Sequence, residues 1–299
     1  MTTQKSSIIL SDEVKRASKN RIHGIVLFLF AGLLSTFING EMRYLGQTHG
    51  YHPFQLVFLY SILGAVCYLP SVMRHPQLVQ PQRIKLLALR SFLEVVAFTA
   101  VFFAVTLLPF AMFTTLTFTS PLIGAVMAVY WLGERMTKPK IIGLIMGFIG
   151  IIIVSNPSSE GMNWAIFLPL FAAICFSGCG VLIRKLAATE HSSCIAVCTL
   201  LGMAILSLPL ALTHWQSITW EHAPYIALLA VMVGVVQFCV GHALGKIELT
   251  LAQPLIFLNL ITSSLLGWLI FDETVTSNIW LGAFCIIAGI IYSLRRKIS

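Results

Sequence analysis

Arg90 and Glu94 are the residues of this chain whose types and spacing best suit chemistry. They lie one helical turn apart inside an apolar stretch at 86–107, so in a helix they share one face. A charge near the centre of a bilayer costs at least about 2.5–3.5 kcal/mol. The pair is therefore either a structural ion pair or, as we expect, a cavity-facing site for a proton or for a cationic group of a substrate.

Several uncharged polar side chains also fall inside apolar stretches of the sequence. Polar groups at membrane depth face the interior of a helix bundle or a cavity rather than lipid. We therefore expect a central cavity lined by Asn39, Tyr60, Thr117, Ser120, Gln237 and Asn259.

Enzyme chemistry finds little support in the residue types. The only aspartates, Asp12 and Asp272, lie outside the apolar stretches. The sequence also has no HExxH, GxSxG or Walker motif. We expect no catalytic residues, no metal and no cofactor, so any transport would be secondary rather than driven by ATP.

The elements that must position these residues are membrane-spanning helices. Of the 299 residues, 58% are apolar and 10% are charged, whereas soluble domains average about 25% charged residues. A span needs roughly 20 apolar residues. The chain predicts ten spans, near 22–39, 54–73, 86–107, 110–132, 141–155, 163–183, 194–213, 223–243, 249–271 and 278–294.

Lys and Arg residues orient these spans, because they concentrate in cytoplasmic segments. With the N-terminus inside, 18 of the 19 fall in or beside inner segments, and only Arg43 lies outside. We therefore predict an inner-membrane protein whose tails, 1–21 and 295–299, are both cytoplasmic. The net charge of +8 is then a topology signal, and we expect no nucleic-acid partner.

The chain contains an internal repeat. Residues 108–152 match 247–291 at an offset of 139, which aligns Ser120 with Asn259 and Glu134 with Glu273. Five spans in each half is an odd number, so the halves, 22–155 and 163–294, insert in opposite directions. The predicted fold is an all-α membrane protein of ten transmembrane helices in two inverted five-helix repeats, a common construction of secondary transporters.

Two features of the repeat have structural interpretations. Glu134 and Glu273 each precede a helix expected to start near Thr137 or Thr276. We expect them to be structural turn residues, with a hydroxyl capping each helix and the carboxylate near its positive end. The glycines of 141–155 and 278–294 are typical of close helix packing, either within one chain or in a dimer. The sequence therefore leaves a monomer and a homodimer open.

These motifs resemble a known family. Leu132-Gly133-Glu134-Arg135 followed by Gly143 and Gly150, and its repeat from Phe271, look like the ends of two EamA domains. The tandem pair resembles the drug/metabolite transporter superfamily. Three further stretches resemble its S-adenosylmethionine uptake branch, Arg43-Tyr44-Leu45-Gly46, His52-Pro53-Phe54-Gln55 and Leu89-Arg90-Ser91-Phe92-Leu93-Glu94.

The resemblance implies a secondary-active transporter that moves a small polar metabolite by alternating access. S-adenosylmethionine or a related metabolite is the leading substrate, and amino acids, riboflavin and drugs are alternatives. A passive facilitator and a lipid-acting membrane enzyme are the alternatives from other classes. The expected partners are the metabolite and membrane lipids.

Overall fold

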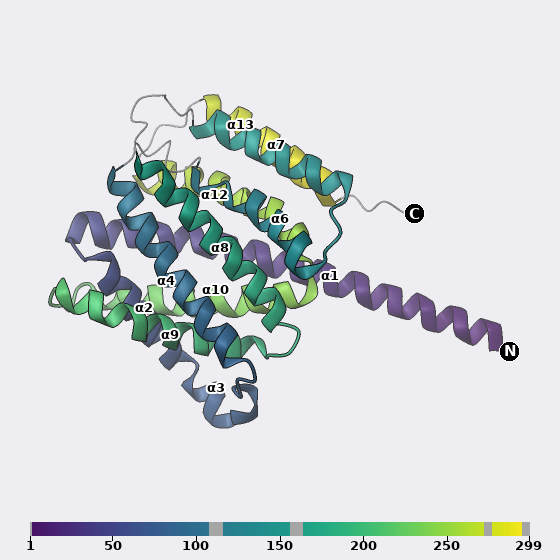
Figure 1. Cartoon of the computed structure of the whole chain (residues 1–299), viewed down its shortest axis with the longest axis horizontal. Helices are drawn as coiled ribbons and strands as arrows, with labels where there is room; N and C mark the ends of the chain where they lie inside the picture. Colours follow the sequence, from purple (N-terminus) through teal and green to yellow (C-terminus); the bar gives the residue numbers. More distant parts are fainter. Residues whose placement is uncertain (1, 108–115, 156–163, 272–276, 295–299) are drawn as a thin grey trace.

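The computed structural model describes residues 2–107, 116–155, 164–271 and 277–294, which form helices and no strands (Figure 1). The α-helices are α1 (Thr2–Arg43), α2 (Pro53–Cys67), α3 (Leu69–Arg74), α4 (Ile84–Leu107), α6 (Ser120–Leu132), α7 (Lys138–Ser155), α8 (Phe167–Leu186), α9 (Ser192–Thr213), α10 (Ala223–Lys246), α11 (Leu249–Ile256), α12 (Leu258–Phe271) and α13 (Ser277–Leu294). Single turns of π or 3-10 helix cover Tyr44–Thr48, Pro76–Leu78 and Trp164–Ile166.

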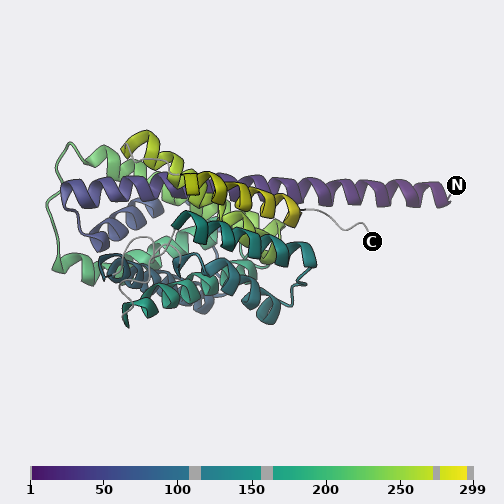
Figure 2. The same ribbon diagram turned by 90° about the horizontal axis from the view of Figure 1, so that it is seen from above.

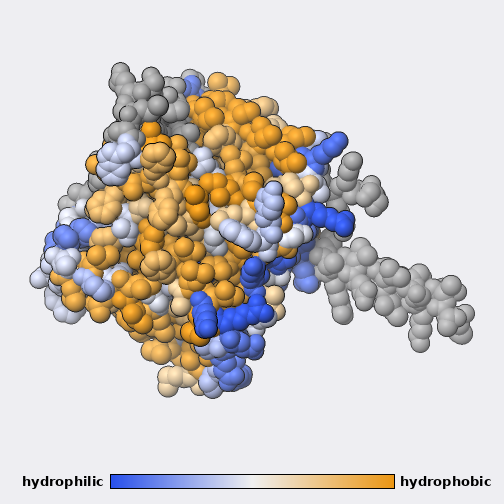
Figure 3. Space-filling model, in the orientation of Figure 1, coloured by the Kyte–Doolittle hydropathy of each residue, from blue (hydrophilic) through white to orange (hydrophobic). Residues whose placement is uncertain are grey.

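The surface of the bundle suits a lipid environment. Six helices are long and apolar enough to cross a membrane, and three shorter apolar helices accompany them in the described residues. Large apolar side chains such as Phe103, Ile205 and Phe284 are exposed, and the space-filling view is mostly hydrophobic (Figure 3). The chain is a multi-pass membrane protein, and the count of ten spans stays a prediction.

Two expected spans contain a local helix break near a proline, and the first of them, Pro53–Arg74, is still long and apolar enough to cross a membrane. The stretch 54–73 divides at Tyr68 into α2 and α3, beside Pro70. The stretch 249–271 divides at Phe257 into α11 and α12, beside Pro254. Proline removes a backbone donor and crowds the preceding turn. At both breaks the backbone N–H donates three residues back instead of four, Tyr68 to Ala65 (3.1 Å) and Phe257 to Pro254 (3.3 Å).

Helix α1 is longer than the predicted span of 22–39. It begins at Thr2 and continues to Arg43, and its N-terminal part extends well away from the bundle (Figures 1 and 2). The residues predicted to be a polar N-terminal tail are therefore a helical continuation of the first span.

The two halves repeat each other in structure at the offset found in the sequence. Helices α2, α4 and α7 each begin 139 residues before α9, α10 and α13. The N-cap hydrogen bonds of α2 and α9 are equivalent as well. His52 Nδ1 accepts the N–H of Phe54 (3.4 Å) at the start of α2, and His191 Nδ1 accepts the N–H of Ser193 (3.2 Å) at the start of α9.

Equivalent helices of the two halves pack against each other in opposite directions. His52 at the start of α2 stacks on His214 at the end of α9, with ring centroids 4.2 Å apart. The pairing between halves is also reciprocal, because α1 packs on α10 and α4 packs on α8. This arrangement brings side chains of both halves together along the middle of the bundle.

Glycines bring α7 and α13 into direct backbone contact. A β-carbon added to Gly143 would lie 2.7 Å from the carbonyl oxygen of Gly289, and one added to Gly150 would lie 2.7 Å from that of Gly282. Of the two interpretations open from the sequence, the structure uses these glycines for packing within the chain.

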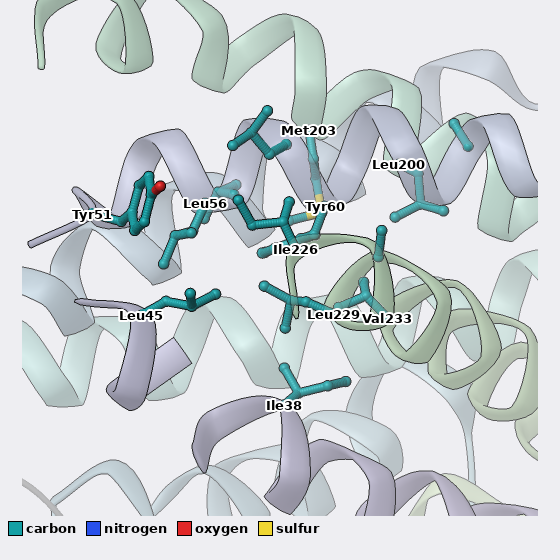
Figure 4. Close-up of a cluster of buried hydrophobic side chains, with 14 of the residues drawn as sticks. Ile38, Leu45, Tyr51, Leu56, Tyr60, Leu200, Met203, Ile226, Leu229 and Val233 are labelled. Atoms are coloured by element: carbon teal, nitrogen blue, oxygen red, sulfur yellow. The ribbon is translucent and has the colours of Figure 1, made fainter. Parts of the chain in front are cut away.

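The largest buried cluster lies between α1, α2, α9 and α10 and includes Tyr60, Leu200, Met203, Ile226 and Leu229 (Figure 4). The cluster fixes α2 and α9 against α10. One turn beyond Leu229, at Val233, it approaches Gln237, the polar residue of α10 discussed next.

Candidate functional site

Helix α4 carries Arg90 and Glu94 into the middle of the bundle. Glu94 lies ten residues after Ile84, the first residue of this 24-residue helix. That is roughly 15 Å along an axis of about 36 Å. The structure therefore places the charged pair near the centre of a helix that is long enough to span a membrane.

Arg90, Glu94 and Gln237 form a closed network between the two halves. Arg90 Nη2 lies 3.4 Å from Glu94 Oε2 and donates to Gln237 Oε1 at 2.7 Å. The Gln237 amide in turn donates from Nε2 to Glu94 Oε1 at 3.0 Å. Since Gln237 is on α10, the network joins the first half of the chain to the second.

Arg90 is held from two further helices. Its Nη1 donates to Thr199 Oγ1 on α9, and its carbonyl oxygen lies 3.6 Å from Cys179 Sγ on α8. The guanidinium is almost fully buried, with 3% of the side chain exposed. The guanidinium is thus bonded at Nη1 and Nη2, whereas its buried Nε has no hydrogen-bond partner.

One carboxylate oxygen of Glu94 is also without a hydrogen bond. Its Oε1 accepts from Gln237, but its buried Oε2 accepts no hydrogen bond and has only the ion pair with Arg90. The Glu94 side chain is 13% exposed. A carboxylate oxygen with spare acceptor capacity at this depth can take a proton or a cationic donor.

Thr199 was not among the residues singled out from the sequence. Its hydroxyl also donates to the carbonyl of Ile195 (2.7 Å), within its own helix. That local bond is common for Thr in membrane helices, so a mid-helix Thr carries no sequence signal for a long-range partner. Only the fold brings it to Arg90.

Tyr60 lies in the apolar cluster of α2, and 2% of its surface is exposed. Its side chain is packed among apolar side chains of that cluster (Figure 4).

Of the four remaining predicted cavity residues, two lie in separate contacts between helices. Ser120 on α6 pairs with Ser177 on α8, with the hydroxyl oxygens 3.3 Å apart. Asn259 on α12 packs directly against Gly32 of α1. Asn39 lies on the same face of α1 two turns further along and is exposed, and Thr117 is half-buried just before α6. The hydrogen bonds of the Arg90 side chain run instead to Thr199 and Gln237.

Glu134 has a capping role, although not on the helix expected. The sequence suggested the helix near Thr137, but the carboxylate oxygens accept the N–H groups of Leu249 and Thr250 at the start of α11, both at 2.8 Å. The partner helix belongs to the other half, which sequence spacing alone does not reveal. Glu273 lies outside the described residues.

Comparisons with known proteins agree with this architecture. The model of the EamA-like transporter family matches residues 22–156 and 163–295. The S-adenosylmethionine uptake transporter of Rickettsia felis is 26% identical over 288 residues, covering 95% of this chain and 97% of that protein. The riboflavin transporter of Vibrio cholerae is also 26% identical, over 275 residues, covering 91% and 92%.

One solved protein crystal structure shares the fold. It superposes with a TM-score of 0.78 at 17% identity, covering 91% of this chain and 97% of the other. Two family segments, one in each half, account for most of the sequence. This chain therefore belongs to the EamA-like transporter family, within the drug/metabolite transporter superfamily.

Proposed function

We propose that this chain is a secondary-active transporter of the inner membrane that moves a small polar metabolite carrying a cationic group, with S-adenosylmethionine as the leading substrate. The observation that carries the proposal is the Arg90–Glu94–Gln237 network, buried at mid-helix between the two halves. Intramembrane ionisable residues are costly and mark substrate or ion pathways.

The chemistry of the network suits exchange of cations at one oxygen. A sulfonium or ammonium group that reaches Glu94 Oε2 would replace part of the attraction that Arg90 now supplies at 3.4 Å. Arg90 would keep its bonds to Thr199 and Gln237. A proton would neutralise the same carboxylate, so substrate and proton would compete for Glu94.

The symmetry of the two halves supports alternating access. Equivalent helices run antiparallel, as α2 and α9 do, and the α1–α10 and α4–α8 contacts are reciprocal. Two such halves can exchange conformations and open a central site to one side at a time. The basic residues orient both termini to the cytoplasm, and the membrane potential then adds about 2.3 kcal/mol per charge per 100 mV to inward movement of a cation.

Riboflavin is the second candidate, because a relative named as a riboflavin transporter aligns over 91% of this chain. Riboflavin is uncharged at neutral pH. Its transport would therefore gain nothing from the membrane potential and would not require a carboxylate at Glu94, which separates the two candidates experimentally.

The test is uptake of radiolabelled S-adenosylmethionine and riboflavin into proteoliposomes with an imposed potential, comparing wild type with Glu94→Gln. The amide keeps the size of the side chain and removes its charge. We expect at least a tenfold loss of potential-dependent S-adenosylmethionine uptake. Glu221→Gln, which changes an exposed glutamate away from the network, should behave as wild type.

Two results would contradict the proposal. One is normal, pH-dependent uptake by a well-folded Glu94→Gln protein, which would leave Glu94 a structural partner of Arg90. The other is riboflavin uptake without S-adenosylmethionine uptake, which would assign the second substrate instead.

A further inference from the structure

Two carboxylates outside the central network hold helix starts at one end of the molecule. We call this the basic end, because it carries Arg83, Lys85, Arg135, Lys138, Arg184, Lys185 and Lys246. Glu190 Oε1 accepts the N–H groups of Gln82 and Arg83 just before α4, both at 2.8 Å. Glu134 accepts those of Leu249 and Thr250 at the start of α11, also at 2.8 Å.

These contacts, the Glu190 clasp and the Glu134 clasp, are strong for a physical reason. The N–H groups bound by Glu134 are the first two of α11, which have no partner within the helix. Those bound by Glu190 belong to the two residues before α4, and in both cases the helix start carries partial positive charge. A carboxylate that accepts two of them makes charge-assisted bonds, roughly twice as strong as neutral ones. Both glutamates are buried, with 7% of the Glu134 side chain and 8% of Glu190 exposed.

Additional charges reinforce the Glu134 clasp. Arg184 Nε on α8 lies 3.6 Å from Glu134 Oε1. Lys140 on α7 contacts Glu248, which immediately precedes α11, and donates to Thr250 Oγ1 at 2.7 Å. Cations and carboxylates from the two halves therefore alternate across this end.

The two clasps are reciprocal between the halves. Glu134 belongs to the first half and holds α11 of the second, whereas Glu190 belongs to the second half and holds α4 of the first. A movement that separates the halves at the basic end must therefore break both. Breaking the Glu190 clasp also frees the start of the helix that carries Arg90 and Glu94.

We propose that the Glu134 and Glu190 clasps form one gate that closes the basic end, so that opening to that side requires the release of both carboxylates. This inference rests on the alternating access proposed above. It assigns a function to two buried acidic residues that the central network does not contact.

A native cysteine reports on this gate. Cys194 is 1% exposed, and its sulfur lies 3.6 Å from Glu190 Oε2, beneath the clasp. The labelling rate of Cys194 in the wild-type protein serves as the reference. The full-length protein in lipid nanodiscs would be treated with a water-soluble maleimide, and the labelling rate of each cysteine would be read by peptide mass spectrometry.

We expect Glu190→Gln and Glu134→Gln each to raise the labelling rate of Cys194 several-fold relative to wild type. The amides preserve an acceptor and the side-chain size, so both variants should fold, which the melting temperature would check. The Glu134 variant is decisive because Glu134 bonds to α11 rather than to the region of Cys194. Glu221→Gln is the matched control and should label as wild type.

Cys194 labelling at the wild-type rate in Glu134→Gln would overturn the single gate, because purely local loosening would affect only the Glu190 variant. An equal rise in Glu221→Gln would overturn it as well. Maleimide labelling requires no substrate. A wild-type protein that takes up none of the tested metabolites would therefore contradict the proposed function without altering this result.

Discussion

Tyr51 and Glu190 lie 139 residues apart, each one residue before the histidine that caps α2 or α9, at opposite ends of the molecule. Glu190 accepts two backbone N–H groups before α4 at 2.8 Å. Tyr51 reaches the start of the equivalent helix, α10. Its hydroxyl accepts the N–H of Thr219 at 3.4 Å and lies 3.0 Å from His222 Nδ1.

The comparison shows that the repeat determines where Tyr51 and Glu190 lie, whereas the residue type determines how strong each contact is. The fold brings the residue before each capping histidine to the start of a helix in the other half. The residue type then decides whether the contact is a pair of short charge-assisted bonds or two bonds to a neutral hydroxyl, at 3.4 and 3.0 Å. We infer that Glu190 holds its helix start more firmly than Tyr51 holds the equivalent one.

The largest expected effect comes from removing the stronger contact. Glu190→Leu would remove two hydrogen bonds to a charged group, those from the N–H groups of Gln82 and Arg83, and such bonds contribute about 1.5–3 kcal/mol each. We expect the free energy of unfolding, measured in mixed detergent micelles, to fall by about 3 kcal/mol. Glu221→Leu, at an exposed position, should change it by less than about 0.5 kcal/mol.

Tyr51→Phe should have a smaller effect, because it removes a single hydroxyl. His222 keeps a contact with Thr219 Oγ1 at 2.8 Å, so only the Thr219 N–H loses its acceptor. We expect a loss of about 1 kcal/mol in the same unfolding measurement. If this variant destabilises as much as Glu190→Leu, the inferred inequality between the two helix starts is wrong.

The smallest expected effect is a pH dependence of local stability at the start of α2, at the end opposite the basic end. Burial, and then the neighbouring His214, lower the pKa of His52 from its ordinary value of 6.5. The open or unfolded state therefore binds the proton more readily, so the stabilisation is complete above pH 6.5 and is lost as the pH falls. Protonation of Nδ1 would also remove the acceptor that caps α2.

Hydrogen exchange at pH 5 and pH 7.5 tests this expectation. Amides at 52–56, at the start of α2, should exchange faster at the lower pH after correction for intrinsic rates. Those at 84–88, at the start of α4, should change less. His52→Gln retains a capping acceptor that does not titrate and should abolish the difference. A pH effect of equal size at both helix starts would contradict the comparison.

Several of these features were predictable because they depend on local spacing or on long stretches of sequence. Arg90 and Glu94 are four residues apart, so any helix brings them together. The offset of 139 was visible around Glu134 and holds for the starts of α2 and α4 as well. The breaks beside Pro70 and Pro254 were missed because hydropathy runs smoothly across both.

The long-range partners were not predictable. Gln237 stood out as a polar residue in an apolar stretch, but its amide meets Glu94 across 143 positions of sequence. Thr199 and Ser177 also bond within their own helices, which is the ordinary behaviour of such residues. From the sequence, Glu134 was expected to lie at the start of the helix near Thr137. The packing of the two halves places it at the start of α11 instead.

The glycine contacts between α7 and α13 have a consequence for how such a chain evolves. Gly143 contacts Gly289, and Gly150 contacts Gly282. The 139-residue offset relates Gly143 to Gly282 and Gly150 to Gly289, so the two contacts are equivalent in the repeat. This is the pattern of an isologous dimer interface, in which residue i meets j and j meets i. In a true homodimer, a mutation at any position would appear in both subunits at once. Joining the copies in one polypeptide allows the seam to stay symmetric while Tyr51 and Glu190 diverge.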